Sequence, residues 1–122
     1  MSIESDMRAA FLANANVAAL LVDRFYPLQA PQGVSLPTIV YQHNSGDGER
    51  TLGGVFVQQE ARYTLRLVTA DYSTIVQLKA ACLELAGSSY GVISDFDITE
   101  GGDGFDFDTE RYIKVINVLC LM

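Results

Sequence analysis

The sequence predicts an α+β domain, an antiparallel β-sheet of about four strands with helices packed on one face. Apolar residues recur at helical spacing near the N-terminus and around residues 71–86, and they alternate with polar residues at strand spacing elsewhere. The resulting order, α-α-β-β-α-β-β, leaves consecutive strands close enough to pair as hairpins. The length fits a single domain spanning residues 1–122.

Two helices are expected first. The first has apolar residues at i, i+4, i+7 and i+8, namely Ile3, Met7, Ala10 and Phe11. Ser2 or Ser5 is its expected cap. The run Asn14-Ala15-Asn16 then interrupts the pattern, and Asn16 is expected to cap a second, short helix that ends near Val22.

The first strands follow a proline-rich stretch. Three prolines and Gly33 enforce an extended path between Arg24 and Pro37, where residues 24–26 are a candidate for a short edge strand. Thr38 to His43 is rich in β-branched and aromatic residues, which predicts a strand. Residues 44–54 hold four glycines and are expected to form a polar, flexible loop.

The next strand, Val55 to Thr69, alternates in character. Tyr63, Leu65 and Leu67 are expected to face the core, with Arg62, Thr64 and Arg66 on the opposite face. Asp71 or Ser73 should then cap a helix that runs to about Ala86 and is ended by Gly87.

The last two strands enclose a polar run. Val92 to Thr99 alternates apolar and acidic residues, and Arg111 to Leu121 is a strongly apolar strand. Between them, Gly101 to Asp108 is rich in glycine and aspartate, and we expect a solvated hairpin loop there, with a specific calcium site as the lesser alternative.

Charge excludes one class of function. The net charge is −7, and the stretch between Lys79 and Arg111 contains eight acids and no Lys or Arg. Proteins that grip nucleic acid neutralise its phosphates with Lys and Arg, so we expect no sequence-specific nucleic-acid binding. The N-terminus lacks the basic and apolar regions of an export signal, and the longest apolar run, Val17 to Val22, is too short for a bilayer. A soluble protein made in a cytoplasm is expected, with no membrane partner.

The sequence offers no catalytic arrangement. It has one histidine, His43, with no obvious partner, and no serine in a nucleophile elbow. The glycines near residue 48 do not open a helix or precede a GKS or GKT sequence, which argues against a nucleotide site. Cys82 and Cys120 lie in apolar patterns and are expected to be buried thiols. We expect no enzyme, no cofactor and no bound metal.

The charged loops point instead to protein contacts. Cations are expected on one side of the domain and a dense group of acids on another, an arrangement that suits head-to-tail contacts between identical copies. The candidate interface residues are Arg50, Arg62, Arg66, Asp103, Asp106, Asp108 and Glu110. For each arginine, a solvated face is the alternative.

A resemblance to a known family supports this interpretation. The run Arg24-Phe25-Tyr26-Pro27-Leu28-Gln29-Ala30-Pro31-Gln32-Gly33, followed by residues 36–41, resembles the tail completion proteins (head–tail joining or tail terminator proteins) of long-tailed bacteriophages and prophages. Residues 61–67, the helix start at Asp71-Tyr72 and the hairpin entered at Glu110-Arg111-Tyr112 resemble it too. The acidic run from Gly101 to Asp108 is not a feature of the resemblance.

The resemblance implies a structural virion protein. Its members form a ring, commonly of six copies, at the head-proximal end of the tail tube, where they end tube growth and join the tail to the head connector. The implied partners are copies of the chain, the tail tube protein and the connector, with DNA only passing through. The implied location is the host cytoplasm during assembly and then the virion tail.

Two other functions stay open at this stage. One is another position in the same machine, such as a head–tail connector adaptor or a minor tail component. The other is a small module that binds a cation or ligand through the acidic loop.

Overall fold

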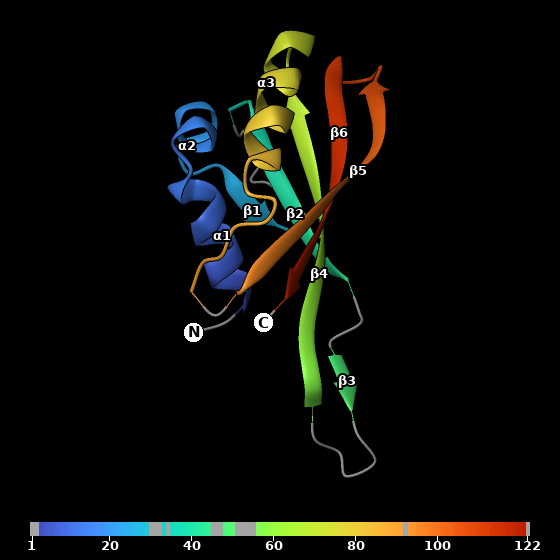
Figure 1. Cartoon of the computed structure of the whole chain (residues 1–122). Helices are drawn as coiled ribbons and strands as arrows, with labels where there is room; N and C mark the ends of the chain where they lie inside the picture. The colour runs from blue at the N-terminus through green and yellow to red at the C-terminus, as the bar shows by residue number, and fades with distance from the viewer. Residues whose placement is uncertain are drawn as a thin grey trace.

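A computed structural model of the chain describes residues 3–29, 33, 35–44, 48–50, 56–91 and 93–121. Three helices and six strands occur in these ranges (Figure 1). In chain order they are α1 (Ile3–Ala13), α2 (Ala15–Leu21), β1 (Phe25–Pro27), β2 (Thr38–Asn44), β3 (Gly48–Arg50), β4 (Phe56–Thr69), α3 (Tyr72–Leu83), β5 (Asp95–Asp106) and β6 (Arg111–Leu121). The predicted α+β class is confirmed.

The sheet is mixed, so the prediction of four antiparallel strands is wrong in detail. Five strands lie in the order β1-β2-β4-β6-β5, and β3 pairs with β4 outside this path. β1 runs parallel to β2, with Phe25 opposite Ile39. Polar contacts hold β1 in place: the Arg24 Nε–H donates to the Pro37 carbonyl at 2.9 Å, and the Thr38 hydroxyl donates to the Arg24 carbonyl at 3.1 Å.

The predicted loop at residues 44–54 contains a strand. β3 pairs antiparallel with the first part of β4, with Gly48 opposite Gln59. The two strands project beyond the body of the sheet as an arm (Figure 1). Residues 45–47 and 51–54 of the predicted loop, and Val55 at the predicted start of the next strand, lie outside the described residues.

The predicted acidic loop is largely strand. β5 continues through the glycines to Asp106 and pairs with β6 along its length, with a register shift between Glu100 and Asp103. The turn is confined to residues 107–110. β6 explains this, because a long apolar strand needs a hydrogen-bonding partner along its whole backbone, whatever side chains that partner carries.

All three helices lie on one face of the sheet (Figure 1). Asn14 caps α2, its side chain accepting from the backbone N–H groups of Asn16 and Val17, so the prediction of Asn16 as the cap is wrong. Asp71 caps α3, as predicted, by accepting from the Thr74 N–H at 2.7 Å. α3 ends at Leu83, earlier than predicted.

The core lies between the helices and the sheet. Phe11 from α1 sits at its centre, with ring centroids 5.7 Å from Phe25 and 6.1 Å from Phe96. Cys82 and Cys120 are buried free thiols, as predicted, and burial raises the pKa of each to about 12. Five strands and three helices therefore contribute side chains to one hydrophobic core, and the face of the sheet turned away from the helices stays open.

Candidate protein-interaction surfaces

The open face of the sheet carries two of the three predicted arginines, Arg62 and Arg66. On β4, alternation places Tyr63, Leu65 and Leu67 in the core, and Arg62 and Arg66 are exposed on the other side, as predicted. In the strand ladder Arg62 lies opposite Leu119 of β6, and Arg66 lies opposite Val115. Within the described part of the chain, Arg66 has no ion pair. The open face therefore presents an exposed cation beside aliphatic side chains.

Three of the four predicted acidic residues lie in or next to the turn between β5 and β6. Asp106 ends β5 opposite Arg111, and Asp108 and Glu110 lie in the exposed turn at residues 107–110. The Asp108 N–H donates to the Asp106 carboxylate at 3.0 Å, which fixes the turn locally. Val115 lies four positions after Arg111 on β6, roughly 13 Å along the strand. The acidic turn is therefore well separated from Arg66 of the same chain.

Asp103, the fourth predicted acid, lies apart from this turn. Its Oδ1 is 2.7 Å from the Lys114 Nζ, and Lys114 is 8% exposed. Lys114 also lies 3.2 Å from a Glu100 oxygen, which in turn is 3.2 Å from the Lys79 Nζ. The hydrogen bond with Asp103 raises the pKa of Lys114, and those from Lys114 and Lys79 lower the pKa of Glu100. Asp103 therefore forms an ion pair within the chain and is also a candidate residue for contact with another protein.

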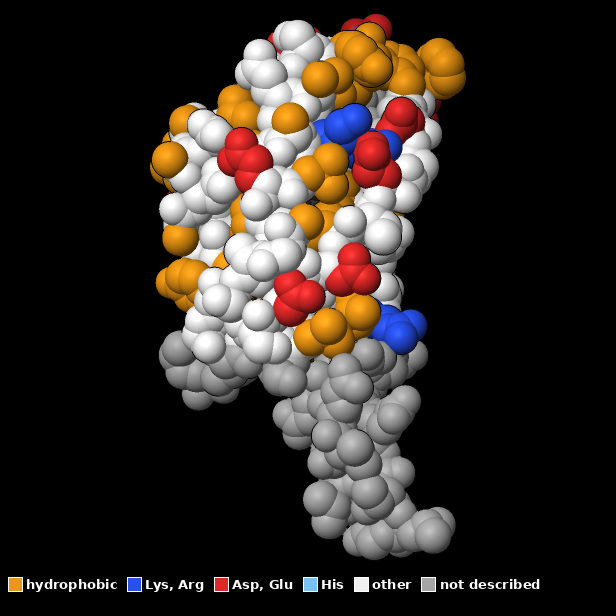
Figure 2. Space-filling model, in the orientation of Figure 1, with side chains coloured by type: hydrophobic (Ala, Val, Ile, Leu, Met, Phe, Trp, Pro, Cys, Tyr) orange, Lys and Arg blue, Asp and Glu red, His pale blue; other side chains and the backbone are white. Residues whose placement is uncertain are grey.

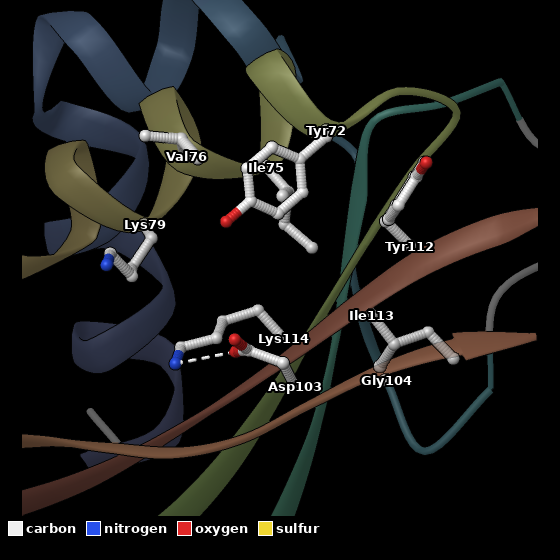
Figure 3. A pocket seen from close by; sticks show the side chains of 9 residues that line it. All are labelled: Tyr72, Ile75, Val76, Lys79, Asp103, Gly104, Tyr112, Ile113 and Lys114. Carbon is white, nitrogen blue, oxygen red and sulfur yellow. Dashed lines mark ion pairs between the residues drawn. The ribbon is translucent and has the colours of Figure 1, made fainter.

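The Lys114–Asp103 ion pair lies on the floor of a groove between α3 and the β5–β6 hairpin, and Lys79 lines the groove beside it (Figure 3). Tyr72, Ile75 and Val76 line it from α3, and Tyr112 and Ile113 line it from β6. Its volume is about 190 Å³. The groove has mainly apolar walls and a floor that carries Lys79, Asp103 and Lys114, a lining suited to an aliphatic or aromatic side chain.

An aromatic ladder continues from this groove to the tip of the hairpin. Ring centroids lie 5.8 Å apart for Tyr72 and Tyr112, 4.9 Å for Tyr112 and Phe105, and 5.1 Å for Phe105 and Phe107. Phe107, the last ring, is 84% exposed. Figure 2 shows the apolar surface gathered at this end of the domain, with basic and acidic side chains next to it.

Sequence reasoning missed this ladder and the Lys114 ion pairs. The signal for the ladder was present, because Phe105 and Phe107 stand out as bulky apolar residues in a run of glycine and aspartate. The remaining predicted contact residue, Arg50, ends β3 in the projecting arm, and its side chain lies outside the described residues. His43 is exposed, with its ring centroid 5.1 Å from that of Tyr63.

The described residues of these surfaces do not gather as metal ligands do. Within the described ranges, no three His, Cys, Asp or Glu side chains gather as a metal site would require. The helices described there are all too short or too polar to cross a bilayer. The chemistry these surfaces offer is that of protein contact: exposed aromatic rings, a cation on an aliphatic face and a carboxylate-rich turn.

Comparison with known proteins identifies the family. The sequence profile of the family described as "Tail completion protein gp17" matches residues 5–120, nearly the whole chain. The chain belongs to this family. The protein is therefore a structural component of a phage tail, as the resemblance of residues 24–41 predicted.

The fold has a solved counterpart in a virus-like particle. A chain in the structure "Virion of native gene transfer agent (GTA) particle" superposes on the tail completion protein with a TM-score of 0.75. The two chains are 15% identical, and the match covers 98% of this chain and 94% of the other. At this identity the likeness shows the fold. No curated protein matches the sequence.

Proposed function

We propose that the protein forms a closed ring of six copies at the head-proximal end of the phage tail tube. There it ends growth of the tube and joins the tail to the head connector. The family match over residues 5–120 carries this proposal. Its partners are copies of itself, the tail tube protein and the connector protein, and it is made in the host cytoplasm before it enters the virion.

The arrangement of charge supports assembly from identical copies. Arg62 and Arg66 lie on the open face, while Asp106, Asp108 and Glu110 lie on a turn at one end of the domain. Two different patches of opposite charge on one molecule favour heterologous contacts, which close into rings when the rotation allows. Arg50 and Asp103 complete the proposed set of contact residues.

The acidity of the chain supports a role beside moving DNA. A net charge of −7 repels the phosphate backbone, so DNA passes a ring of such subunits without adhering.

Deleting the gene in the producing phage or prophage tests the proposal. We expect tails of uncontrolled length and heads without attached tails, and restoration by a plasmid copy of the wild-type gene. Tails of normal length that fail to attach would indicate a connector adaptor instead. Normal tails joined to filled heads would refute the proposal.

A thermal shift measurement tests the cation-binding alternative. We expect no change in melting temperature at micromolar calcium. A rise of several degrees would favour a binding module that uses the carboxylates of the β5–β6 hairpin.

A further inference from the structure

β6 carries apolar side chains on both of its faces, with Asn117 as an exposed polar residue on the open one. Ile116, Val118 and Cys120 face the helices and are buried, whereas Val115 and Leu119 face the open side and are half-buried. Antiparallel strands with water on one side usually alternate apolar and polar residues. The open side of β6 is therefore composed like a surface that becomes buried when the protein assembles.

Glycines of β5 leave part of this surface uncovered. Gly104 pairs with Ile113, and Gly102 lies in the register shift between Glu100 and Asp103. Gly101, in the same shift, lies against Val115, where an added methyl group would be 2.9 Å from that side chain. A methyl group added at Gly102 or Gly104 would meet no atom within 4 Å, and neither has a positive φ. Packing and backbone conformation within the chain therefore do not require glycine at these two positions.

The result is a hollow of about 400 Å³ beside the β6 side chains. It is lined by Gly102, Asp103, Gly104, Phe105, Asp106, Ile113 and Val115. Glycine in a strand often marks close approach of another chain. Arg66 of β4 lies next to the hollow, because it is opposite Val115 of β6 in the strand ladder. The open face thus offers an apolar hollow with an exposed cation at its border.

The turn at the end of the same hairpin has the complementary chemistry. Phe107 is 84% exposed and stands between the carboxylates of Asp106 and Asp108. Its ring packs edge-on against Phe105, so the turn is organised before it meets a partner. Burying a phenylalanine side chain contributes about 1.5–3 kcal/mol, and preorganisation reduces the entropy cost of binding.

We propose that the turn at residues 107–110 of one copy docks on the open sheet face of the next copy. Phe107 covers the hollow beside Val115, and Asp108 and Glu110 lie toward Arg66. Of the carboxylates that border the hollow, Asp103 is paired with Lys114 and Asp106 lies at the end next to the turn. This assignment rests on the proposed ring and names the two surfaces that build it.

The contact is heterologous, because the turn and the hollow are different patches of one chain. Each copy offers one of each, and a ring uses both on every copy. A second copy of this chain is favoured over a different protein as the occupant of the hollow. The turn and the border of the hollow carry opposite charges, and every copy supplies one turn and one hollow.

Photo-crosslinking in assembled particles tests the contact. We expect the Phe107→p-benzoylphenylalanine variant to form a covalent dimer of this protein, with the crosslinked peptide mapping to β4 or β6. The same probe at Tyr90, which is exposed on a different loop, is the control and should give no such peptide. No crosslink from residue 107, or one confined to the helix face or to another protein, would overturn the assignment. Absence of the protein from particles would instead refute the proposed function.

A charge exchange tests the pairing in the same particles. Arg66→Glu should lower the yield of joined particles at least tenfold, and adding Asp108→Arg in the same chain should restore much of it. The pair Gln77→Glu and Ala86→Glu changes the net charge equally on exposed positions away from both patches, and should leave the yield unchanged. Equal loss in the control, or no rescue, would contradict the pairing.

Discussion

The two faces of the sheet differ in how they are completed. The face toward the helices is closed within the chain, since Phe11 and Phe96 meet there with no exposed surface left on Phe11. The opposite face leaves Val115 and Leu119 half-exposed and shows Arg66 to solvent. The comparison teaches that the chain covers one face of the sheet with its own helices and leaves the other open, as the proposed contact between copies requires.

The charges follow the same division. On the helix side, Lys79 and Lys114 are paired with Glu100 and Asp103 inside the molecule. On the open side, Arg66 has no such partner among the described residues. Charges that stabilise the fold are therefore distinguishable from charges that are free to meet a neighbour.

Removing a core ring is the largest expected effect. Phe11→Ala should lower the free energy of unfolding by about 3–5 kcal/mol, because it leaves a cavity among buried rings. Val115→Ala on the open face should lower it by less than about 1 kcal/mol, because that side chain is half-exposed. Urea unfolding followed by circular dichroism measures both. Equal losses of stability from the two substitutions would contradict the distinction between the two faces of the sheet.

The next largest effect is a loss of stability at alkaline pH, caused by two tyrosines on the face of the sheet that packs against the helices. Burial raises the pKa of Tyr41 and of Tyr63 to about 12, and Glu4 adds to the effect at Tyr41 by accepting its hydroxyl at 3.1 Å. The folded state therefore holds these protons more tightly than the unfolded state. Their contribution to stability is complete below about pH 10 and is lost as the pH rises toward 12.

Spectroscopic titration checks this sign. Two of the six tyrosines should form tyrosinate only near pH 12 in the folded protein. The variant with Tyr41→Phe and Tyr63→Phe should lose less stability between pH 10 and 12 than the wild type. Stability that increases with pH over this range would contradict burial of both phenols.

A helix cap gives a smaller effect. Asn14→Ala should lower the free energy of unfolding by about 1 kcal/mol, because two N–H groups at the start of α2 lose their acceptor. Asn16→Ala is the matched control, since that side chain is exposed and bonds only to Glu84. Denaturant unfolding should give the Asn16→Ala variant a free energy of unfolding within about 0.5 kcal/mol of the wild-type value. A larger loss for Asn16 would place the cap where the sequence alone predicted it.

The smallest effect on stability should accompany the largest effect on assembly. Arg66→Glu is expected to change the free energy of unfolding by no more than about 0.5 kcal/mol, because Arg66 is exposed. Calorimetry of the purified variant measures this. A variant that unfolds easily would mean that Arg66 supports the fold instead of a contact.

Much of the fold follows from local pattern. The spacing of Met7, Ala10 and Phe11 predicts α1, and the alternation of Arg62 to Leu67 assigns each side chain of β4 to the correct face. The apolar run of β6 has the predicted bounds, residues 111–121. These elements are predictable because their own residues determine both their conformation and their buried side.

The remainder depends on partners distant in sequence. β1 is held by contacts of Arg24 with residues 37–38, which no local pattern contains. β5 continues through Gly101 and Gly102 because β6 supplies the hydrogen-bonding partner. The pairing of Asp103 with Lys114 follows from that register. A glycine- and acid-rich run predicts a loop when read alone, and tertiary pairing overrides it.

The candidate surfaces were predictable in part. The sequence indicated cations on one face of β4 and acids near the hairpin turn, and the structure places Arg62, Arg66, Asp106, Asp108 and Glu110 accordingly. The sequence showed Phe105 and Phe107 as isolated bulky residues, but it could not indicate that Tyr72 joins them in one ladder, because Tyr72 belongs to a helix that lies far away in the sequence.

Cryo-electron microscopy of the junction between head and tail in the producing phage tests the central claim most directly. We predict one ring of this protein at the end of the tube, with the turn of each copy seated on the open sheet face of its neighbour. A junction in which that open face lies bare to solvent, while the protein occupies its place in the particle, would contradict the account.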